Sequence, residues 1–155
     1  PELTKVLGLV AESSFLRSLG HVEHNLTVRI TSFSYKKGIP GDPSGNGGGY
    51  VFDCRAIHNP GRYEEYKSLT GKDPAVRQFL EEKSEMKEFL NAAAILVEQS
   101  VKVYIDRGFN HLSVNFGCTG GQHRSGDAAE KLAQRIRNNF SGNVVVIHRE
   151  QEKKG

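Results

Sequence analysis

Alternation of apolar and polar side chains predicts the first strand of a sheet near the start of the chain. Over residues 26–35 the apolar members Leu26, Val28 and Ile30 alternate with the polar members Thr27, Arg29 and Thr31. A period of two residues is typical of a strand with one buried face. Two further strands are predicted at 50–54 and 111–116. The run 143–147, nearly all valine and isoleucine, predicts a fourth strand buried on both faces.

Apolar residues at three- and four-residue spacing predict the helices. Asp73 followed by Pro74 has the pattern of an N-cap and a first helical residue, which opens a helix to about Glu81. Ser84 is the expected cap of a long amphipathic helix that ends before Gly108. Another helix is expected over 125–140. A weaker apolar period over 7–19 indicates one or two short helices.

The order of these elements predicts an α/β domain. Strand, helix and strand over 111–147 form a βαβ unit, whose strands are expected to be parallel with a right-handed crossover. We therefore expect a mixed, mostly parallel sheet with flanking helices over residues 26–150. Residues 36–49, rich in glycine, and the polar stretch 55–73 are predicted loops. Residues 1–25 are expected to be an N-terminal extension or linker remnant, and 151–155 the end of a charged tail that starts at Arg149.

The composition indicates the cellular location of the protein more than its function. A formal charge of +3 is too mild to require a polyanionic partner. No apolar stretch approaches the roughly 20 residues of a membrane helix, and the N-terminus lacks the pattern of a signal peptide. We expect a cytoplasmic protein with no membrane partner, in which Cys54 and Cys118 are reduced thiols.

One polar segment between the third strand and its helix carries the main candidate chemistry. It consists of Gly117, Cys118, Thr119, Gly120, Gly121, Gln122, His123, Arg124 and Ser125. A helix N-terminus offers unpaired N–H groups and a positive dipole, which suit an anion. Gly120 and Gly121 permit positive φ and close wrapping around a ligand, and Arg124 has a planar fork that matches phosphate oxygens. A plain tight turn needs fewer polar side chains, so we interpret the segment as a phosphate site.

Cys118 and Arg124 also leave an enzymatic alternative open. Five residues separate them and Ser125 follows, which is the C-x-x-x-x-x-R-S spacing of cysteine-dependent phosphatases. Against catalysis, Gly117 stands where those enzymes usually have histidine, and no general-acid loop is assigned, although Asp53 and Asp127 exist. A non-catalytic binding module is therefore preferred to an enzyme.

A second polar cluster follows the second strand. Asp53, Arg55, His58 and Asn59 would face the anion segment if the second strand neighbours the third, and an ordinary salt-bridged loop is the alternative. Lys36 and Lys37 would also reach a ligand or RNA, or simply lie in solvent. We expect no cofactor and no metal, because His21 and His24 lack further ligands at zinc spacing, and no P-loop motif occurs.

Five sequence blocks resemble a known family, the C-terminal domain of the RNase adapter protein RapZ, also called the YvcJ family. They are the segments 31–40, 51–55 with Asn59-Pro60, 69–73, 117–125 and 148–150, in matching order and spacing. The resemblance implies a phosphofructokinase-like α/β fold, oligomer formation, and binding of glucosamine 6-phosphate and a small regulatory RNA. It also implies an adapter that presents RNA to an endoribonuclease, with Lys36, Lys37, Arg149, Lys153 and Lys154 as the expected RNA contacts.

The chain departs from the family pattern in three places. Residues 1–25 replace the usual kinase-like domain, which leaves a stand-alone relative or an excised C-terminal piece as alternatives. The loop 41–49 is longer and richer in glycine. Of the basic tail cluster, only Lys153 and Lys154 remain.

Overall fold

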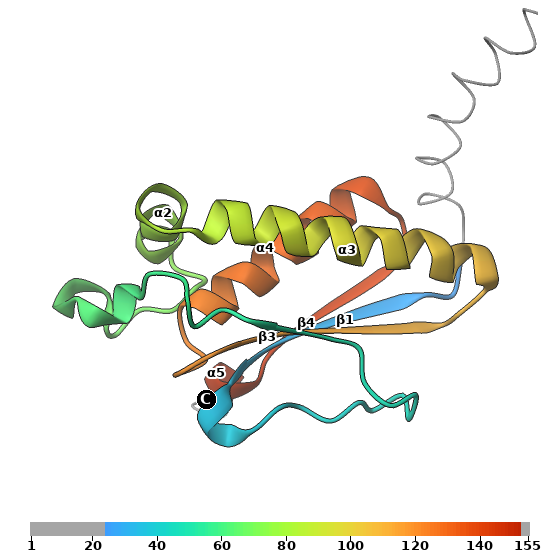
Figure 1. Cartoon of the computed structure of the whole chain (residues 1–155), viewed down its shortest axis with the longest axis horizontal. Helices are drawn as coiled ribbons and strands as arrows, with labels where there is room; N and C mark the ends of the chain where they lie inside the picture. Colours follow the sequence, from blue (N-terminus) through green and yellow to red (C-terminus); the bar gives the residue numbers. More distant parts are fainter. Residues whose placement is uncertain (1–23, 153–155) are drawn as a thin grey trace, which may run out of the picture.

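The computed structural model describes residues 24–152 as a four-stranded sheet with its main helices on one face (Figure 1). The strands are β1 (Thr27–Ser34), β2 (Tyr50–Asp53), β3 (His111–Cys118) and β4 (Asn143–His148), in the order β2-β3-β1-β4. All three pairings are parallel. The expected α/β class, with a parallel sheet and flanking helices, is confirmed. β3 and β4 are parallel as expected, but β1 lies between them.

The helices are α2 (Pro74–Lys83), α3 (Met86–Arg107), α4 (Arg124–Asn139) and the short α5 (Arg149–Glu152). Three single turns of 3-10 helix are also present: η1 (Tyr35–Lys37), η2 (Pro60–Arg62) and η3 (Glu64–Tyr66). The long helices therefore lie where the apolar periods predict them. The N-cap of α3 is Glu85, so the expected cap at Ser84 is wrong by one residue, although the Ser84 hydroxyl accepts a hydrogen bond from the Met86 N–H, 3.1 Å away. The helix predicted over 7–19 lies outside the described residues.

The hydrophobic core lies between the sheet and the helices α3 and α4, which cross the same face (Figure 1). Val28 and Ile30 of β1 point into it and are buried, as the alternation predicts. Thr31 is also buried, at 4% exposed, so the expectation of a single buried face holds only for the first part of the strand. At the β2 edge, the Phe52 ring stacks on Phe116 of β3 at 5.4 Å and meets Phe89 of α3 edge-on at 6.3 Å. Aromatic packing thus fixes β2 beside β3.

The opposite face of the sheet is covered by a loop and a short helix rather than by long helices. The glycine-rich loop, residues 38–49, runs along this side, and α5 lies near the start of the loop (Figure 1). Within this loop, the Asp42 carboxylate lies 3.5 Å from the Ser113 hydroxyl and 3.7 Å from His111 Nε2, both on β3. One carboxylate therefore holds the loop against the sheet.

β4 differs from its prediction. It is one of the two edge strands of the sheet in the described residues, and Val145 is 43% exposed. The expectation that both faces are buried is wrong, because a valine-rich run indicates a strand but does not say whether neighbours flank it on both sides.

Residues 149–152 form α5 where a charged tail was expected. Glu150 is buried, and its Oε2 accepts a hydrogen bond from the Ser34 N–H at 2.8 Å. Arg149 donates from Nε to the same Glu150 oxygen at 2.9 Å and from Nη2 to the Gly38 carbonyl at 2.7 Å. These contacts close the end of β1.

A buried histidine joins β1, β4 and α4. His148 Nδ1 lies 2.7 Å from the Ser32 hydroxyl, and its Nε2 lies 2.6 Å from Glu130 Oε1. Ser32 is fully buried, so this chain of hydrogen bonds satisfies polar groups inside the fold.

Candidate anion-binding site

The turn between β3 and α4, residues 117–125, forms at the carboxyl edge of the sheet, as the sequence predicts. β3 ends at Cys118, and α4 begins at Arg124 with His123 as its N-cap. Asp53 at the end of β2 pairs in register with Gly117. The second strand therefore lies beside the third, which is the arrangement needed to bring the two polar clusters together.

Two glycines of this β3–α4 turn are required by close packing. A Cβ at Gly117 would lie 2.4 Å from Phe33 Cζ and 2.5 Å from Tyr35 Cε2. Gly121 has φ of 71°, and a Cβ there would lie 2.8 Å from Glu150 Cγ. Gly120 is exposed with ordinary φ and open space around it, so the tip of the turn faces solvent.

The backbone of the turn contains a run of N–H groups without partners, and those of Thr119 and Gly120 belong to exposed residues. Within residues 24–152, no hydrogen bond is formed by any backbone N–H from Thr119 to Gly126. Donors in the first turn of a helix lack intrahelical partners, and here the preceding loop adds more of them. Such a row at the positive end of a helix dipole is suited to binding an anion.

The side chains of the turn mainly hold its shape. Cys118 is buried, and its Sγ lies 3.2 Å from the Ser125 hydroxyl. His123 Nε2 contacts the Tyr66 carbonyl at 2.8 Å, and the Gln122 carbonyl accepts from the Gly71 N–H at 2.7 Å. The Cys118 thiol therefore faces the interior, and His123 is committed to a neighbouring loop.

Arg124 links the start of α4 to the segment after β2. Its Nη1 donates to the Arg55 carbonyl at 2.7 Å and to the Ile57 carbonyl at 2.9 Å. The residue is 5% exposed, and its buried Nε has no partner within the described residues. A fixed guanidinium with spare donor capacity suits charge-assisted binding of an anion.

Arg124 also lines a hollow of about 340 Å³ beside the turn. Four cationic side chains and one carboxylate border this cationic hollow. Its lining residues are Arg55, Ala56, Ile57, His58, Asn59, Arg62, Lys83, Glu85 and Arg124. Excess positive charge in a concave site raises the local concentration of anions.

Asp53 and Arg55 neutralise each other at the rim of the hollow. Arg55 Nη2 lies 2.7 Å from Asp53 Oδ2, and the Arg55 guanidinium lies 3.9 Å from the centre of the Tyr35 ring. Hydrogen bonds from Arg55 lower the pKa of the Asp53 carboxyl, and burial raises the pKa of the Tyr35 hydroxyl. The pair positions Arg55 and leaves Asp53 less able to contact a ligand.

His58 and Asn59 reach the hollow from the segment after β2. The His58 ring stacks on Phe79 at 5.6 Å, and its Nε2 lies 2.9 Å from the Tyr63 hydroxyl. The Asn59 side chain accepts from the Gly61 N–H at 2.9 Å and caps η2. Both side chains therefore have structural partners as well as a place in the wall.

The structure brings together most of the residues proposed from the sequence and adds three that sequence reasoning missed. Arg62, Lys83 and Glu85 line the cationic hollow. They come from a single turn, the end of α2 and the residue before α3, where no motif marks them. Arg62 alone had a signal, since it follows the Asn59-Pro60-Gly61 turn directly.

The residues proposed for RNA contact are not in equivalent settings. Lys36 and Lys37 are exposed on η1, close to the end of β1. Arg149 is engaged by Glu150 and by the Gly38 carbonyl. Lys153 and Lys154 lie outside the described residues.

Residues 24–152 contain no cluster of three or more potential metal ligands, and His24 lies against the Ser141 carbonyl. None of their helices has the length and apolar content needed to cross a bilayer.

Comparison with known proteins identifies a family whose model matches most of the chain. The family model described as RapZ C-terminal domain matches residues 26–152. A nucleotide-binding protein of Fusobacterium nucleatum is 40% identical over 131 residues, which cover 83% of this chain and 43% of that protein. A nucleotide-binding protein of Endomicrobium trichonymphae is 39% identical over 132 residues, which cover 85% of this chain and 42% of that protein. A nucleotide-binding protein of Ruminiclostridium cellulolyticum is 35% identical over 136 residues, which cover 88% of this chain and 45% of that protein. The chain spans less than half the length of these relatives.

Proposed function

The chain belongs to the RapZ C-terminal domain family, and we propose that it is a non-catalytic binding module that captures a phosphorylated small molecule, an amino-sugar phosphate, at the carboxyl edge of its sheet. The names of the relatives support a binding role in general terms. The ligand class and the residues that contact it are part of the proposal.

The row of unpaired N–H groups from Thr119 to Gly126 carries the proposal. Phosphate oxygens accept several hydrogen bonds at once, and this row supplies donors without displacing any contact that holds the turn. Arg124, whose Nε is still free, completes the anion site from the side of the cationic hollow.

The rest of the ligand would lie in the cationic hollow. An amino sugar carries an ammonium group, and Glu85 is the one carboxylate among the residues that line this hollow. Its Oε1 accepts from the His58 N–H at 3.2 Å, which orients the carboxylate and leaves Oε2 for the ligand. Arg62 and Lys83, at the rim, would add attraction for the phosphate.

The geometry gives less support to a cysteine-dependent phosphatase. The Cys118 residue is only 2% exposed, and its Sγ lies 3.2 Å from the Ser125 hydroxyl. Arg124 donates to two carbonyls after β2 rather than closing over the turn. A nucleophile must face the phosphorus it attacks, and this thiol faces the interior.

Calorimetric titration with glucosamine 6-phosphate tests the proposal. We expect binding to the parent chain, and weaker binding of glucosamine, which lacks the phosphate. Arg62→Gln and Lys83→Gln should each weaken binding by about 3- to 10-fold, because each removes one rim charge. Lys87→Gln is the matched control, since Lys87 is exposed and does not line the cationic hollow.

Two results would contradict the proposal. One is equal affinity of the parent chain for glucosamine 6-phosphate and glucosamine. The other is hydrolysis of an aryl phosphate by the purified chain that disappears in Cys118→Ser, which would make Cys118 a nucleophile and the phosphatase alternative correct.

The proposal extends to the partners implied by the family. Lys36 and Lys37 are exposed and form no ion pair within the described residues, so they are the side chains best placed to contact RNA phosphates near this site. RNA binding, a ribonuclease partner and homo-oligomer formation are proposed for the protein on the family resemblance.

A further inference from the structure

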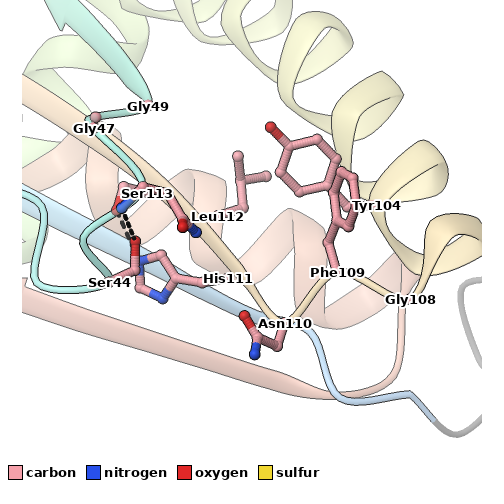
Figure 2. Close-up of a pocket in the computed structure, with 12 residues that line it drawn as sticks. Ser44, Gly47, Gly49, Tyr104, Gly108, Phe109, Asn110, His111, Leu112 and Ser113 are labelled. Carbon is pink, nitrogen blue, oxygen red and sulfur yellow. Dashed lines mark hydrogen bonds between the residues drawn. The ribbon is translucent and has the colours of Figure 1, made fainter.

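A separate hollow of about 610 Å³ lies at the amino edge of the sheet, beside the start of β3 and away from the β3–α4 turn. Figure 2 shows the residues that line it. The last turn of α3, the start of β3 and the glycine-rich loop enclose it. Its lining residues are Ser44, Asn46, Gly47, Gly48, Gly49, Tyr104, Gly108, Phe109, Asn110, His111, Leu112 and Ser113. Its volume lies in the ordinary range for small-molecule sites.

One wall of this amino-edge hollow is aromatic. The rings of Tyr104 and Phe109 lie side by side in Figure 2, and they meet edge-to-face with centroids 5.0 Å apart. Phe109 remains 45% exposed although it follows directly after the end of α3. An exposed ring held in place by a second ring offers a flat surface on which a planar ligand can stack.

The facing wall is backbone. Gly47 and Gly48 have φ of 90° and 121°, and the loop approaches β3 so closely that a Cβ at Gly49 would lie 2.2 Å from the Ser113 carbonyl oxygen. Asp42 holds the loop in this shape by accepting from the N–H groups of Ser44, at 2.9 Å, and Gly48, at 3.0 Å. The wall is thus preformed.

A second hollow of about 590 Å³ continues from the first and carries positive charge. The two share Ser44, Asn110 and His111, and the second adds Arg29 of β1. The Arg29 guanidinium and His111 Nδ1 form no hydrogen bond or ion pair within residues 24–152. Asp42, the nearest carboxylate to His111, is already hydrogen-bonded by its own loop and lines neither hollow.

We propose that the two hollows together form a second ligand site, for a planar heterocycle that carries an anionic group, such as a nucleoside monophosphate. The heterocycle stacks on Phe109, which Tyr104 holds in place, and the side-chain amides of Asn46 and Asn110 meet its polar edge. The phosphate pairs with Arg29 and His111. Aromatic stacking and a free guanidinium at opposite ends of one cavity match the two halves of a nucleotide.

This site is independent of the proposed amino-sugar phosphate site, because the two lie at opposite ends of the parallel strands. His111 begins β3 and Cys118 ends it. The same chemistry, a base with an attached phosphate, occurs in a free nucleotide and in each nucleotide of single-stranded RNA, so the test includes both sources.

Nuclear magnetic resonance titration of the chain tests this inference residue by residue. We expect adenosine monophosphate to shift the amide signals of Gly47–Gly49 and Phe109–Ser113 while those of Thr119–Gly126 move little. Phe109→Ala and Arg29→Gln should each weaken binding about tenfold, since each removes one of the two recognition elements. Arg107→Gln is the matched control, because Arg107 is exposed and lines neither hollow.

Probes that lack one half of the nucleotide sharpen the result. Adenosine and ribose 5-phosphate should each bind more weakly than adenosine monophosphate. If a hexa-adenylate strand shifts these amide signals and the free nucleotide does not, RNA is identified as the source of the ligand. Absence of shifts at Gly47–Gly49 and Phe109–Ser113 with both probes would overturn the proposal, as would binding that Arg29→Gln and Phe109→Ala leave unchanged.

Discussion

The β3–α4 turn and the glycine-rich loop both contain several glycines, but the residue serves a different purpose in each. In the turn, Gly117 and Gly121 are needed because neighbouring atoms leave no room for a Cβ. In the loop, Gly47 and Gly48 have nothing within 4 Å of a Cβ and are needed for their positive φ. The first segment is fixed by packing against the sheet, and the second by its own backbone and one carboxylate.

This difference shows what glycine content in a sequence can and cannot indicate. Both segments are predicted as irregular structure, and both are irregular. The sequence does not distinguish a turn that is packed on β1 and α5 from a loop that is tied at Asp42, because the distinction depends on neighbours distant in the chain. Substitutions at single glycines can separate the two cases.

Gly121→Ala should have the largest effect on stability. The new Cβ would lie 2.9 Å from the Ser34 nitrogen, and the backbone would keep a φ of 71°. We expect the free energy of unfolding to fall by about 2–4 kcal/mol, because overpacking and a strained φ act together. Urea denaturation measures this.

Gly120→Ala is the matched control for that substitution. Its Cβ meets no atom nearer than 4.0 Å, and its φ is not positive. Its effect should stay within about 0.5 kcal/mol. Equal losses at the two positions would mean that the turn is not held by packing as described.

Gly48→Ala should have a smaller effect, confined to the glycine-rich loop. Space is open around a Cβ there, so the cost comes only from φ of 121° and should be about 1–2 kcal/mol. Gly41→Ala, with open space and no positive φ, provides the comparison. If urea denaturation showed the same loss of unfolding free energy for Gly48→Ala as for Gly121→Ala, the loop would be as tightly packed as the turn, and the contrast between them would be wrong.

The smallest expected effect is a pH response limited to the glycine-rich loop. Hydrogen bonds from the Ser44 hydroxyl, the Gly48 N–H and the Ser44 N–H lower the pKa of the Asp42 carboxyl well below its usual range. The contribution of this tie is therefore complete above the unfolded pKa of about 3.9 and is lost as pH falls through the lower folded value. The Gly48 and Ser44 amide signals should report this loss.

Asp42→Asn distinguishes this tie from general acid unfolding. An asparagine oxygen still accepts hydrogen bonds but does not titrate, so the low-pH change in the Gly48 signal should disappear. Persistence of the change in Asp42→Asn would assign it to another group.

The fold was largely predictable from local patterns, and the errors lie where position in the sheet matters. Alternation over 26–35 and the helical periods specify elements, which is why β1, α3 and α4 agree with expectation. The edge position of β4 was not predictable, because Val145 has the same side chain whether or not another strand covers it. Residues 149–152 resembled a tail, and only the buried contact of Glu150 with the Ser34 N–H explains why they form a helix.

The candidate site was predictable in its centre and not at its rim. The strand-to-helix turn has a sequence pattern with a physical reason, so its position followed directly. Lys83 and Glu85 reach the cationic hollow because α2 ends and α3 begins beside it, and nothing in the sequence near them indicates this. The interior direction of the Cys118 thiol also depends on Ser125 and the surrounding core, so the C-x-x-x-x-x-R-S spacing alone gave no information about it.

The central position of β1 has a consequence for how the chain acquires its structure during synthesis. β1 is made first among the strands, yet Ser32 pairs with His148 at a separation of 116 residues. A central strand whose residues are mostly buried in the fold therefore emerges from the ribosome long before its partners, and sheets built from such distant pairings form slowly. β2, at the outer edge, pairs with β3 alone, so β1 gains its neighbours only when residues 111–148 have been made. The carboxyl edge of the sheet, with the β3–α4 turn, is accordingly completed only after β4 has been made.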